Sequence, residues 1–284
     1  MTMIKKLIGA VALTLTCTAT YAAESGYPLE TAPNRVNDVA ALQNGAKLFV
    51  NYCLNCHSAS SMRYNKLQDI GLTDDQIKEN LLFTGEKVGD LMTVAMKPED
   101  AKKWFGTTPP DLSVIARAKS INAGPSGADY IYTYMRTFYR NTARATGWDN
   151  LVFPNVGMPH ALWELQGPRE LTTVAMHEVT GQDGAKSWER VTTTYDAQGY
   201  STVKTEPVAD FHGHASVDAK FKALDPAKAA AYDNDVADLT AFLAWMAEPG
   251  QLFRKQLGVW VLLFLGLFLV VAWRLNASYW KHVR

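Results

Sequence analysis

The residues with the clearest chemistry are Cys53, Cys56 and His57, which form a Cys-x-x-Cys-His pattern. At this spacing two thiols can add across the vinyl groups of a haem, and the histidine can reach its iron as proximal ligand. A thioredoxin-like redox pair would open a helix after a buried strand, whereas the residues before Cys53 have a helical pattern. Half of a zinc site would need a second ligand pair, and no cysteine follows Cys56. The pattern therefore predicts one covalent haem c.

A haem bound through His57 would leave one axial position, for which thioethers and imidazoles compete. Met158 is the leading thioether, because Gly157 and Pro159 frame it in a predicted loop that could present its sulfur inward. Met62 lies too close to the haem motif to fold over the opposite face. An open sixth position, as in a gas-binding haem, is a further alternative. The other candidates are methionines in apolar patterns, which usually fill core, and histidines: Met92, Met96, Met135, Met176, His160, His177, His212 and His214.

A helix is predicted to lead directly into the haem motif. Asn37 or Asp38 can cap its start, and Gly45 could let another helix approach closely. Its apolar face repeats at helical spacing through Leu42, Ala46, Phe49 and Cys53. This face would carry the chain into the motif.

A rigid extended turn is predicted at Thr108–Ser113, which contains Pro109-Pro110. Prolines have no N–H, and a free carbonyl of this pair can accept a hydrogen bond from an imidazole N–H. Asp111 or Ser113 can cap the next helix, predicted from Val114 to about Ser120.

The rest of the body is predicted to be mostly helical, with one insertion. Thr172–Val208 is rich in β-branched residues, and strands at Trp188–Tyr195 and Tyr200–Thr205 around the turn Asp196–Gly199 predict a hairpin. The last helix of the body, striped with apolar residues from Val236 to Met246, is expected to pack against the helix that precedes the haem motif. Other helices are predicted at Thr73–Leu82, where Thr73 and Gln76 can form a capping box, and at Asp129–Tyr139. The last helix of the body is predicted to start at Asn234 or Asp235 and to stop at Glu248–Gly250.

Residues 1–22 have the form of a secretory signal peptide. Lys5 and Lys6 precede a short apolar run, and small residues follow, so that cleavage is expected after Ala22 or Ala23. A retained N-terminal anchor is the alternative. Export would place residues 23–253 outside the cytoplasmic membrane.

Residues 254–275 are predicted to be a transmembrane anchor. The stretch Leu257–Trp273 carries no charge, and as a helix it rises about 25 Å, which its flanks extend to the thickness of a bilayer core. A buried core helix is the alternative. With an exported body, the tail 276–284 would be cytoplasmic.

The formal net charge of zero hides an asymmetry between the body and the two ends. All 28 acidic residues lie between Glu24 and Glu248, whereas 7 of the 28 basic residues lie in the signal or around the span. The exported body therefore has 21 basic and 28 acidic residues, a net charge of −7. Such a head would suit a basic soluble partner rather than nucleic acid, although acidity can also serve solubility alone.

Four fragments, in this order along the chain, together resemble the cytochrome c1 family: Asn51–Ser58, Pro109–Lys119, Gly157–Trp163 and Leu243–Pro249 before one C-terminal span. Members of this family are the haem c subunits of quinol–cytochrome c reductase (cytochrome bc) complexes. The resemblance covers nearly the whole mature chain. It implies a mainly α fold: a class I cytochrome c-like haem domain with insertions, including a small β-hairpin, plus one C-terminal transmembrane helix.

The resemblance also implies roles for individual residues. His57 and Met158 would be the axial ligands of the iron. A basic residue soon after the Pro-Pro-Asp-Leu-Ser segment pairs with a haem propionate in the family, and both Arg117 and Lys119 lie in that region. The second of these positions is usually arginine in relatives, so the resemblance does not choose between them. The implied cofactor-binding residues are Cys53, Cys56, His57, Pro110, Arg117, Lys119, Tyr130 and Met158.

The function that the resemblance implies is a one-electron relay with no catalytic residue of its own. As a subunit of ubiquinol–cytochrome c oxidoreductase, the chain would take electrons from the Rieske iron–sulfur protein and pass them to a soluble or tethered cytochrome c. Its span would pack against cytochrome b in a dimeric complex of the bacterial inner membrane, with the haem domain in the periplasm.

Two other classes of protein share the haem motif. A membrane-anchored shuttle outside such a complex would need a long flexible linker, whereas Glu248–Leu257 is short and not rich in Gly or Ser. A haem sensor with an open iron position would keep its spectrum and potential when Met158 is replaced by leucine.

Overall fold

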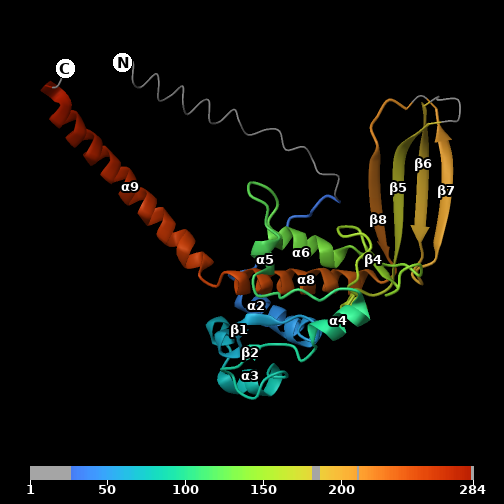
Figure 1. The fold of residues 1–284 in the computed structure, drawn as a ribbon, viewed down its shortest axis with the longest axis horizontal. Helices are drawn as coiled ribbons and strands as arrows, with labels where there is room; N and C mark the ends of the chain where they lie inside the picture. The colour runs from blue at the N-terminus through green and yellow to red at the C-terminus, as the bar shows by residue number, and fades with distance from the viewer. Residues whose placement is uncertain (1–26, 181–185, 210, 283–284) are drawn as a thin grey trace.

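The computed structural model describes residues 27–180, 186–209 and 211–282, so the predicted signal peptide, 1–22, lies outside the described residues. Figure 1 shows a helical head, a four-stranded antiparallel sheet that projects from it, and one long C-terminal helix. This architecture confirms the predicted fold class: mainly helical, with small sheets and one apolar C-terminal helix.

The head is built from short elements around two longer helices. Its elements are α2 (Val39–Leu48), a π-helical turn (Phe49–Cys53), β1 (Ala59–Arg63), a 3₁₀ helix (Tyr64–Ile70), α3 (Asp74–Asn80), β2 (Leu91–Met92), α4 (Pro98–Phe105), α5 (Ile115–Ala118), α6 (Gly127–Arg136), β3 (Phe138–Arg140), β4 (Trp148–Asn150), α7 (Trp163–Gln166) and α8 (Pro226–Ala247).

The centre of the head is the contact between α2 and α8, which confirms the predicted pairing of the two helices. Gly45 permits it: a Cβ atom there would lie 2.3 Å from the Asp238 carbonyl oxygen and 2.6 Å from Phe242 Cβ. One turn further along, the Phe49 and Phe242 rings pack with their centroids 5.7 Å apart. The haem motif therefore starts from a fully buried part of the head, where Phe49 and Phe242 meet.

The helix starts follow local capping chemistry. Asp38 caps α2 by accepting from two backbone N–H groups, and Thr73 forms the predicted capping box with Gln76 at α3. The predicted start of α8 near Asn234 or Asp235 is wrong, because Asp225 caps the helix and proline occupies its first turn.

The boundaries of α6 also differ from the prediction of a helix over Asp129–Tyr139. Ser126 and Asp129 form a capping box that starts the helix at Gly127. The helix ends at Arg136, because the next residues form β3, which pairs with β4.

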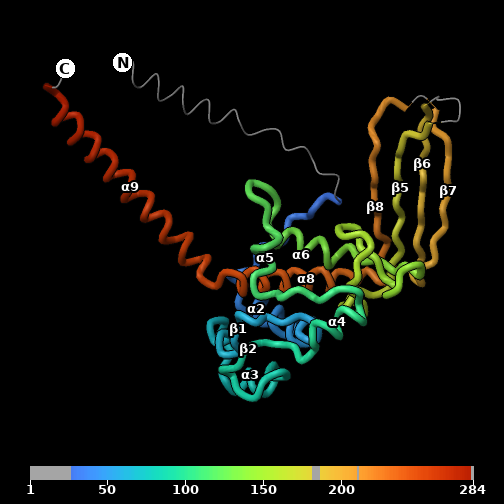
Figure 2. The backbone as a smooth tube through the Cα atoms, in the orientation of Figure 1, coloured from blue at the N-terminus to red at the C-terminus, as the bar shows by residue number. Residues whose placement is uncertain are grey.

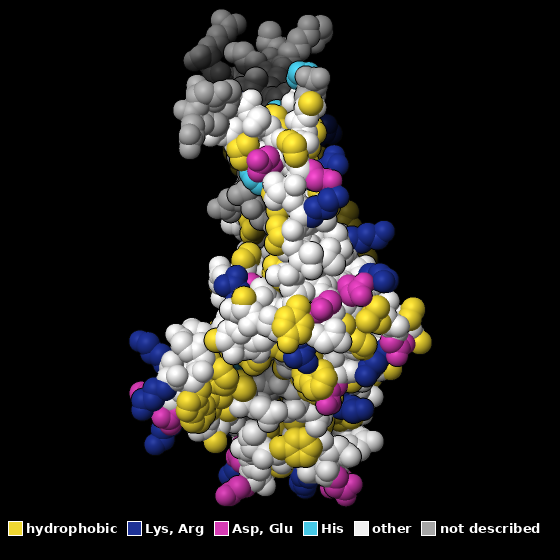
Figure 3. All heavy atoms as spheres, turned by 90° about the vertical axis from the view of Figure 1, so that its right-hand side faces the viewer, with side chains coloured by type: hydrophobic (Ala, Val, Ile, Leu, Met, Phe, Trp, Pro, Cys, Tyr) yellow, Lys and Arg dark blue, Asp and Glu magenta, His cyan; other side chains and the backbone are white. Residues whose placement is uncertain are grey.

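The predicted hairpin is part of a larger sheet. β5 (Arg169–Thr180), β6 (Lys186–Tyr195), β7 (Ser201–Val208) and β8 (Ser216–Ala223) pair antiparallel in the order β7-β6-β5-β8. Figure 3 shows the sheet as a narrow extension above the head. At its base, Thr142 N–H donates to the Gly199 carbonyl, and Tyr139 packs on Tyr195 with centroids 4.8 Å apart.

The anchor helix α9 (Gln251–Tyr279) leaves the head without packing on it, as Figure 2 shows. Within Gln251–His282, the most apolar window of 18 residues has a mean hydropathy of 2.3 and is not buried, so this helix is long and apolar enough to cross a membrane. It extends a few residues beyond the predicted 254–275 at both ends.

Candidate haem site

An apolar cavity of about 330 Å³ lies between the π-helical turn, α6, α8 and two loops. Its volume is within the range of small-molecule and cofactor sites, about 300–1,000 Å³. Cys53, Cys56 and His57 line one side, and Met158 lines it from a loop far along the chain. The fold thus brings together the residues that the sequence singled out.

The π-helical turn presents the Cys-x-x-Cys-His residues to this cavity. Leu54 N–H donates to the Phe49 carbonyl at 2.9 Å, and the Cys53 carbonyl accepts from the N–H groups of Cys56 and His57 at 3.0 and 2.8 Å. π-turns are rare and are frequent at functional sites. The turn ends the helix and holds both sulfurs and the imidazole on one side.

The two thiols are free. Burial raises the pKa of Cys53 to about 12, with a further contribution from Cys56, and burial also raises the pKa of Cys56. Both groups are therefore protonated at neutral pH, unlike the thiolate nucleophile that a dithiol redox centre needs.

His57 is held by Pro110, as the Pro-Pro pair suggested. Nδ1 of His57 donates to the Pro110 carbonyl oxygen at 2.7 Å. Burial lowers the pKa of His57, although the hydrogen bond to Pro110 and the charge of Asp111 oppose this effect. The ring is therefore neutral at neutral pH, with its proton on Nδ1 and the Nε2 lone pair free for a metal.

Hydrogen bonds to Asp111 join the loop that carries Pro110 to the segment after the haem motif. The Asp111 carboxylate accepts from the backbone N–H of Ser60 and Ser113, both at 2.8 Å, and from the Ser60 hydroxyl. Ser113 Oγ accepts from Ser61 N–H at 3.0 Å. The predicted helix-capping role of Asp111 or Ser113 is wrong, because both side chains are used to join these two loops.

The loop before Met158 is fixed by a buried carboxylate. Asp149 accepts from the backbone N–H of Asn155, which has a φ of 63°. Gly157 has no left-handed backbone; it is needed for space, since a Cβ atom there would lie 3.1 Å from the Phe105 carbonyl oxygen. Close approach, rather than backbone freedom, explains the glycine beside Met158.

Tyr134 on α6 is a site residue that the sequence did not identify. Its hydroxyl donates to Met158 Sδ at 3.5 Å, and its ring stacks on Tyr130 at 5.9 Å. Burial raises the pKa of Tyr134, with a further contribution from Tyr130, so the hydroxyl remains a donor. The four-residue spacing of two tyrosines on one helix face was the available signal.

The other candidate axial ligands lie mostly away from the cavity. Met62, Met92 and Met176 are buried in packing positions, whereas Met135 of α6 also lines the cavity. His160 is buried behind it, stacked on Phe138 at 4.7 Å, and burial lowers its pKa to about 3. Among the cavity-lining residues, His57 is the one histidine.

Arg117 and Lys119, the two basic residues after the Pro-Pro segment, have different surroundings in the structure. Lys119 lines the cavity, with Nζ 4.6 Å from the ring centroid of Tyr130, which lines it as well. Arg117 instead faces Glu248, 3.8 Å away, at the junction of α8 and α9. Lys119 is therefore the better placed of the two for an anionic group in the cavity.

These donors fit a covalently attached haem. Two protonated thiols stand beside a neutral imidazole with one free nitrogen, a thioether lines the same cavity, and apolar residues such as Leu239 and Leu243 form its floor. A hydrophobic shell of this kind limits solvent access to a haem.

The profile of the Cytochrome C1 family matches residues 31–187 and 217–283, which leaves residues 188–216 of the sheet unmatched. Cytochrome c1 of Allochromatium vinosum is 40% identical over 98% of this chain and 99% of its own length.

Two further relatives differ in name or in length. A protein of Nitrosomonas europaea named ammonia monooxygenase gamma subunit is 37% identical over the full length of both chains. Cytochrome b/c1 of Bradyrhizobium diazoefficiens is 24% identical over 81% of this chain and 31% of its own. With a family profile that matches most of its residues and a 40% identical relative of the same length, the chain belongs to the cytochrome c1 family.

Proposed function

We propose that this chain is the haem-carrying electron-transfer subunit of a cytochrome bc1 complex and relays single electrons through one covalently bound haem c. The observation that carries the proposal is the convergence of Cys53, Cys56, His57 and Met158 on one apolar cavity. Membership of the cytochrome c1 family supports the same function.

Each residue of the site has a proposed role. The bound haem supplies a one-electron redox centre, and Cys53 and Cys56 hold it through thioether bonds. His57, oriented by Pro110, and Met158 are the axial ligands. Lys119, beside Tyr130, pairs with a propionate. The protein supplies position, a ligand-tuned potential and a docking face.

The partners follow from the family. The name of the Bradyrhizobium relative, cytochrome b/c1, joins this family to a cytochrome b, and the membrane anchor α9 is the element that would pack against it. A Rieske iron–sulfur protein delivers the electron and a cytochrome c removes it, so that the chain acts as a subunit of ubiquinol–cytochrome c oxidoreductase in a dimeric complex.

The proposed location is the bacterial inner membrane. Residues 1–22 act as a cleaved signal, residues 23–253 form the periplasmic haem domain, residues 254–275 cross the membrane and 276–284 stay in the cytoplasm. The short break between α8 and α9, Glu248–Gly250, holds the head close to the membrane and is unlike the long linker of a free shuttle.

Purification of the intact chain in mild detergent tests this proposal. Co-isolation with a cytochrome b and an iron–sulfur protein, together with a haem that resists extraction by acidified acetone, is the expected result. A chain that purifies alone, or with an ammonia-oxidising enzyme as the name of the Nitrosomonas relative suggests, would contradict it.

The ligand Met158 is tested separately. Met158→Leu should change both the visible spectrum and the reduction potential, because methionine ligation raises the potential. Met135→Leu, which alters another methionine that lines the cavity, is the matched control. An unchanged spectrum in Met158→Leu would favour a haem with an open iron position.

A further inference from the structure

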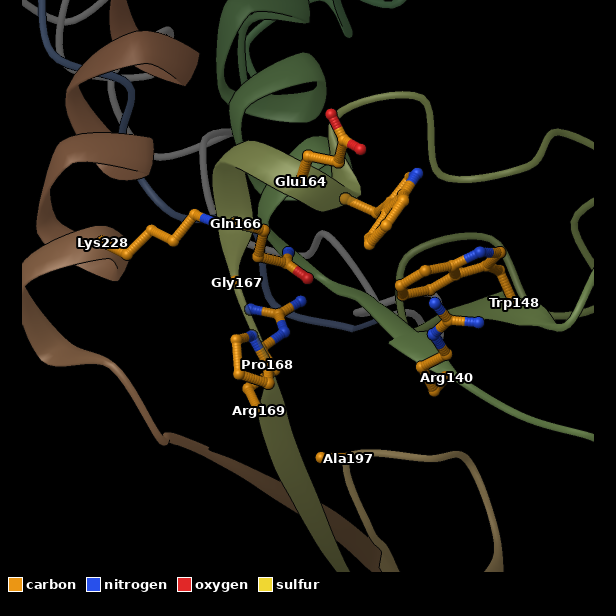
Figure 4. Close-up of a pocket in the computed structure, with 10 residues that line it drawn as sticks. Arg140, Trp148, Glu164, Gln166, Gly167, Pro168, Arg169, Ala197 and Lys228 are labelled. Carbon is orange, nitrogen blue, oxygen red and sulfur yellow. The ribbon is translucent and has the colours of Figure 1, made fainter.

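A second cavity, of about 440 Å³, lies on the side of the head remote from the anchor, where α7, β3, β5 and the start of α8 meet at the base of the sheet. Figure 4 shows its lining residues. The proposed electron relay uses none of them. Its charged residues are Arg140, Glu164, Arg169 and Lys228.

Positive charge dominates this cavity. Arg140, Arg169 and Lys228 line it, and in the part of the chain that the structure describes none of the three has a carboxylate within ion-pair distance, whereas nearby Arg144 and Lys222 are paired. The acidic residue of the lining, Glu164, is exposed, and Figure 4 shows its carboxylate directed away from Arg140 and Arg169.

Arg169 is the deepest of these cations. Its Nη2 donates to the backbone carbonyls of Arg136 and Phe138, which hold the guanidinium in place, and its Nε is buried without a hydrogen-bond partner among the described residues. Burial lowers the pKa of Arg169 to about 10. The charge of Asp233 opposes part of this effect, but from beyond ion-pair distance. Desolvation of a cation that has no ion-pair partner is costly, and a bound anion would relieve that cost.

Two neighbours of Arg169, Gln166 and Lys228, could also bind a polar ligand. Gln166, which is only 4% exposed, lies beside Arg169 in Figure 4, and its Nε2 likewise lacks a hydrogen-bond partner. Gly167 has a φ of 72° and no side chain, so the stem of Lys228 can lie against the turn, where a Cβ atom would be 3.0 Å from Lys228 Cδ. The turn thus brings a second cation to the cavity.

The opposite wall is aromatic. The guanidinium carbon of Arg140 lies 4.4 Å from the ring centroid of Trp148 and 5.6 Å from that of Trp163. This stacking fixes Arg140 without using its N–H donors, which have no hydrogen-bond partner among the residues that the structure describes and can therefore bind a ligand. A flat or apolar group could rest on the indole rings while an oxyanion meets the guanidinium groups.

We propose that this cavity binds a small oxyanion, a phosphate or the carboxylate of a small organic acid, through Arg169, Arg140 and Lys228. Guanidinium groups recognise both kinds of anion with paired hydrogen bonds. The site is independent of the haem cavity, and its occupancy would stabilise the junction between the head and the sheet.

Calorimetric titration of the full-length, haem-loaded protein in detergent tests the proposal, with sodium phosphate and sodium benzoate as probes at constant ionic strength. Saturable binding of at least one probe is expected. Lys228→Met and Arg140→Gln should each weaken it about tenfold, as expected for the loss of a charge-assisted hydrogen bond. Lys220→Met is the matched control, because this exposed lysine of β8 lies outside the cavity and should leave binding unchanged.

The titration has three informative outcomes. Binding of phosphate alone supports a free inorganic ion as the ligand, and tighter binding of benzoate supports an organic acid that uses the indole wall. No saturable binding of either probe, or equal weakening by Lys220→Met and Lys228→Met, would overturn the proposal. An unchanged haem spectrum and circular dichroism in the variants verifies that they are folded.

Discussion

The contact between Tyr134 and Met158 gives a prediction for a single atom pair. The hydroxyl donates to Met158 Sδ, the sulfur of the proposed ligand. In the haem-loaded protein this hydrogen bond would withdraw electron density from the sulfur and so favour the reduced iron. Tyr134→Phe should therefore lower the reduction potential. The expected change is about 40 mV, the one-electron equivalent of about 1 kcal/mol for a neutral hydrogen bond. Spectroelectrochemical titration of the haem-loaded protein measures it.

Tyr132→Phe is the control for this experiment, because Tyr132 lies on the same helix but does not line the haem cavity. Its potential should match that of the wild type. Equal potentials for Tyr134→Phe and the wild type would show that the hydroxyl does not influence the ligand sulfur in the haem-loaded protein.

Asp111 gives a prediction for acid pH. Partial burial opposes its ionisation, but hydrogen bonds from Ser113 and Ser60 outweigh burial and keep its pKa below the ordinary value of 3.8. A carboxyl group whose pKa is lower in the folded state stabilises the protein above its unfolded-state pKa. That stabilisation is lost as the pH falls through the folded-state pKa. Asp111→Asn cannot titrate and lacks this dependence.

The free energy of unfolding of the wild type should therefore exceed that of Asp111→Asn above about pH 4. The difference should be about 1 kcal/mol at most, because Asp111 is mostly exposed and solvent screens its interactions. The difference should shrink below pH 3.8, the ordinary value. Urea unfolding at several pH values measures it, with Asp218→Asn on an exposed strand as the reference. A difference that grows as the pH falls would contradict the hydrogen-bond assignment.

At the scale of single residues, the sequence was most informative where covalent spacing dictates chemistry. The structure brings Cys53, Cys56 and His57, proposed from their spacing, to the same cavity as Met158, proposed from its loop context. Tyr134 and Asp111 could not be assigned, because their partners Met158 and Ser60 are distant in the chain and are set by tertiary packing. The choice between Arg117 and Lys119 likewise depends on the direction of each side chain in the fold.

Among the elements, the crossing of α2 and α8 has little tolerance for added volume. Gly45→Ala would place a methyl group 2.3 Å from the Asp238 carbonyl oxygen, which belongs to the backbone of α8 and cannot rotate away. The two helices would have to separate, and the Phe49–Phe242 contact would loosen. Thermal unfolding of the head should reveal a loss of about 1–3 kcal/mol, the usual cost of overpacking.

Gly89→Ala is the matched control, since nothing lies within 4 Å of a Cβ atom at that position and its φ is not in the left-handed region. It should change stability little. Unaltered stability in Gly45→Ala would mean that the two helices can shift apart without loss of packing. Because the haem motif follows α2 directly, the haem spectrum of Gly45→Ala should also show whether the shift reaches His57.

The elements differ in how far sequence patterns could define them. α2, α3 and the membrane helix follow from apolar periodicity and caps that are local in the chain. Of the four-stranded sheet, only the β6–β7 hairpin was predicted. β8 pairs with β5 across that intervening hairpin, so this partner cannot be read locally. The pairing of β5 with β6, the next strand along the chain, is local and was missed. α8 was predicted too short, since its first turns carry small and polar residues and only the Asp225 cap and the proline after it mark the start.

At the scale of the whole molecule, charge and membrane attachment act together. The body between the predicted signal peptide and the anchor carries 28 acidic and 21 basic residues, and the propionates of a bound haem would add to its negative charge. The anchor α9 keeps this acidic head at the membrane, so a soluble acceptor must reach it by diffusion. Long-range attraction can then raise the association rate of a basic partner.

The second-order rate constant for reduction of a basic soluble cytochrome c should therefore fall as salt is added. We expect a decrease of about tenfold between about 10 and 300 mM ionic strength, because the Debye length drops from about 30 Å to less than 8 Å over this range. Stopped-flow mixing of the reduced full-length protein with the oxidised acceptor measures it. An acidic cytochrome c of similar potential is the control, and its rate should rise over the same range because repulsion is screened. A flat salt dependence for both acceptors would show that the excess of acidic residues lies away from the docking face and serves solubility alone.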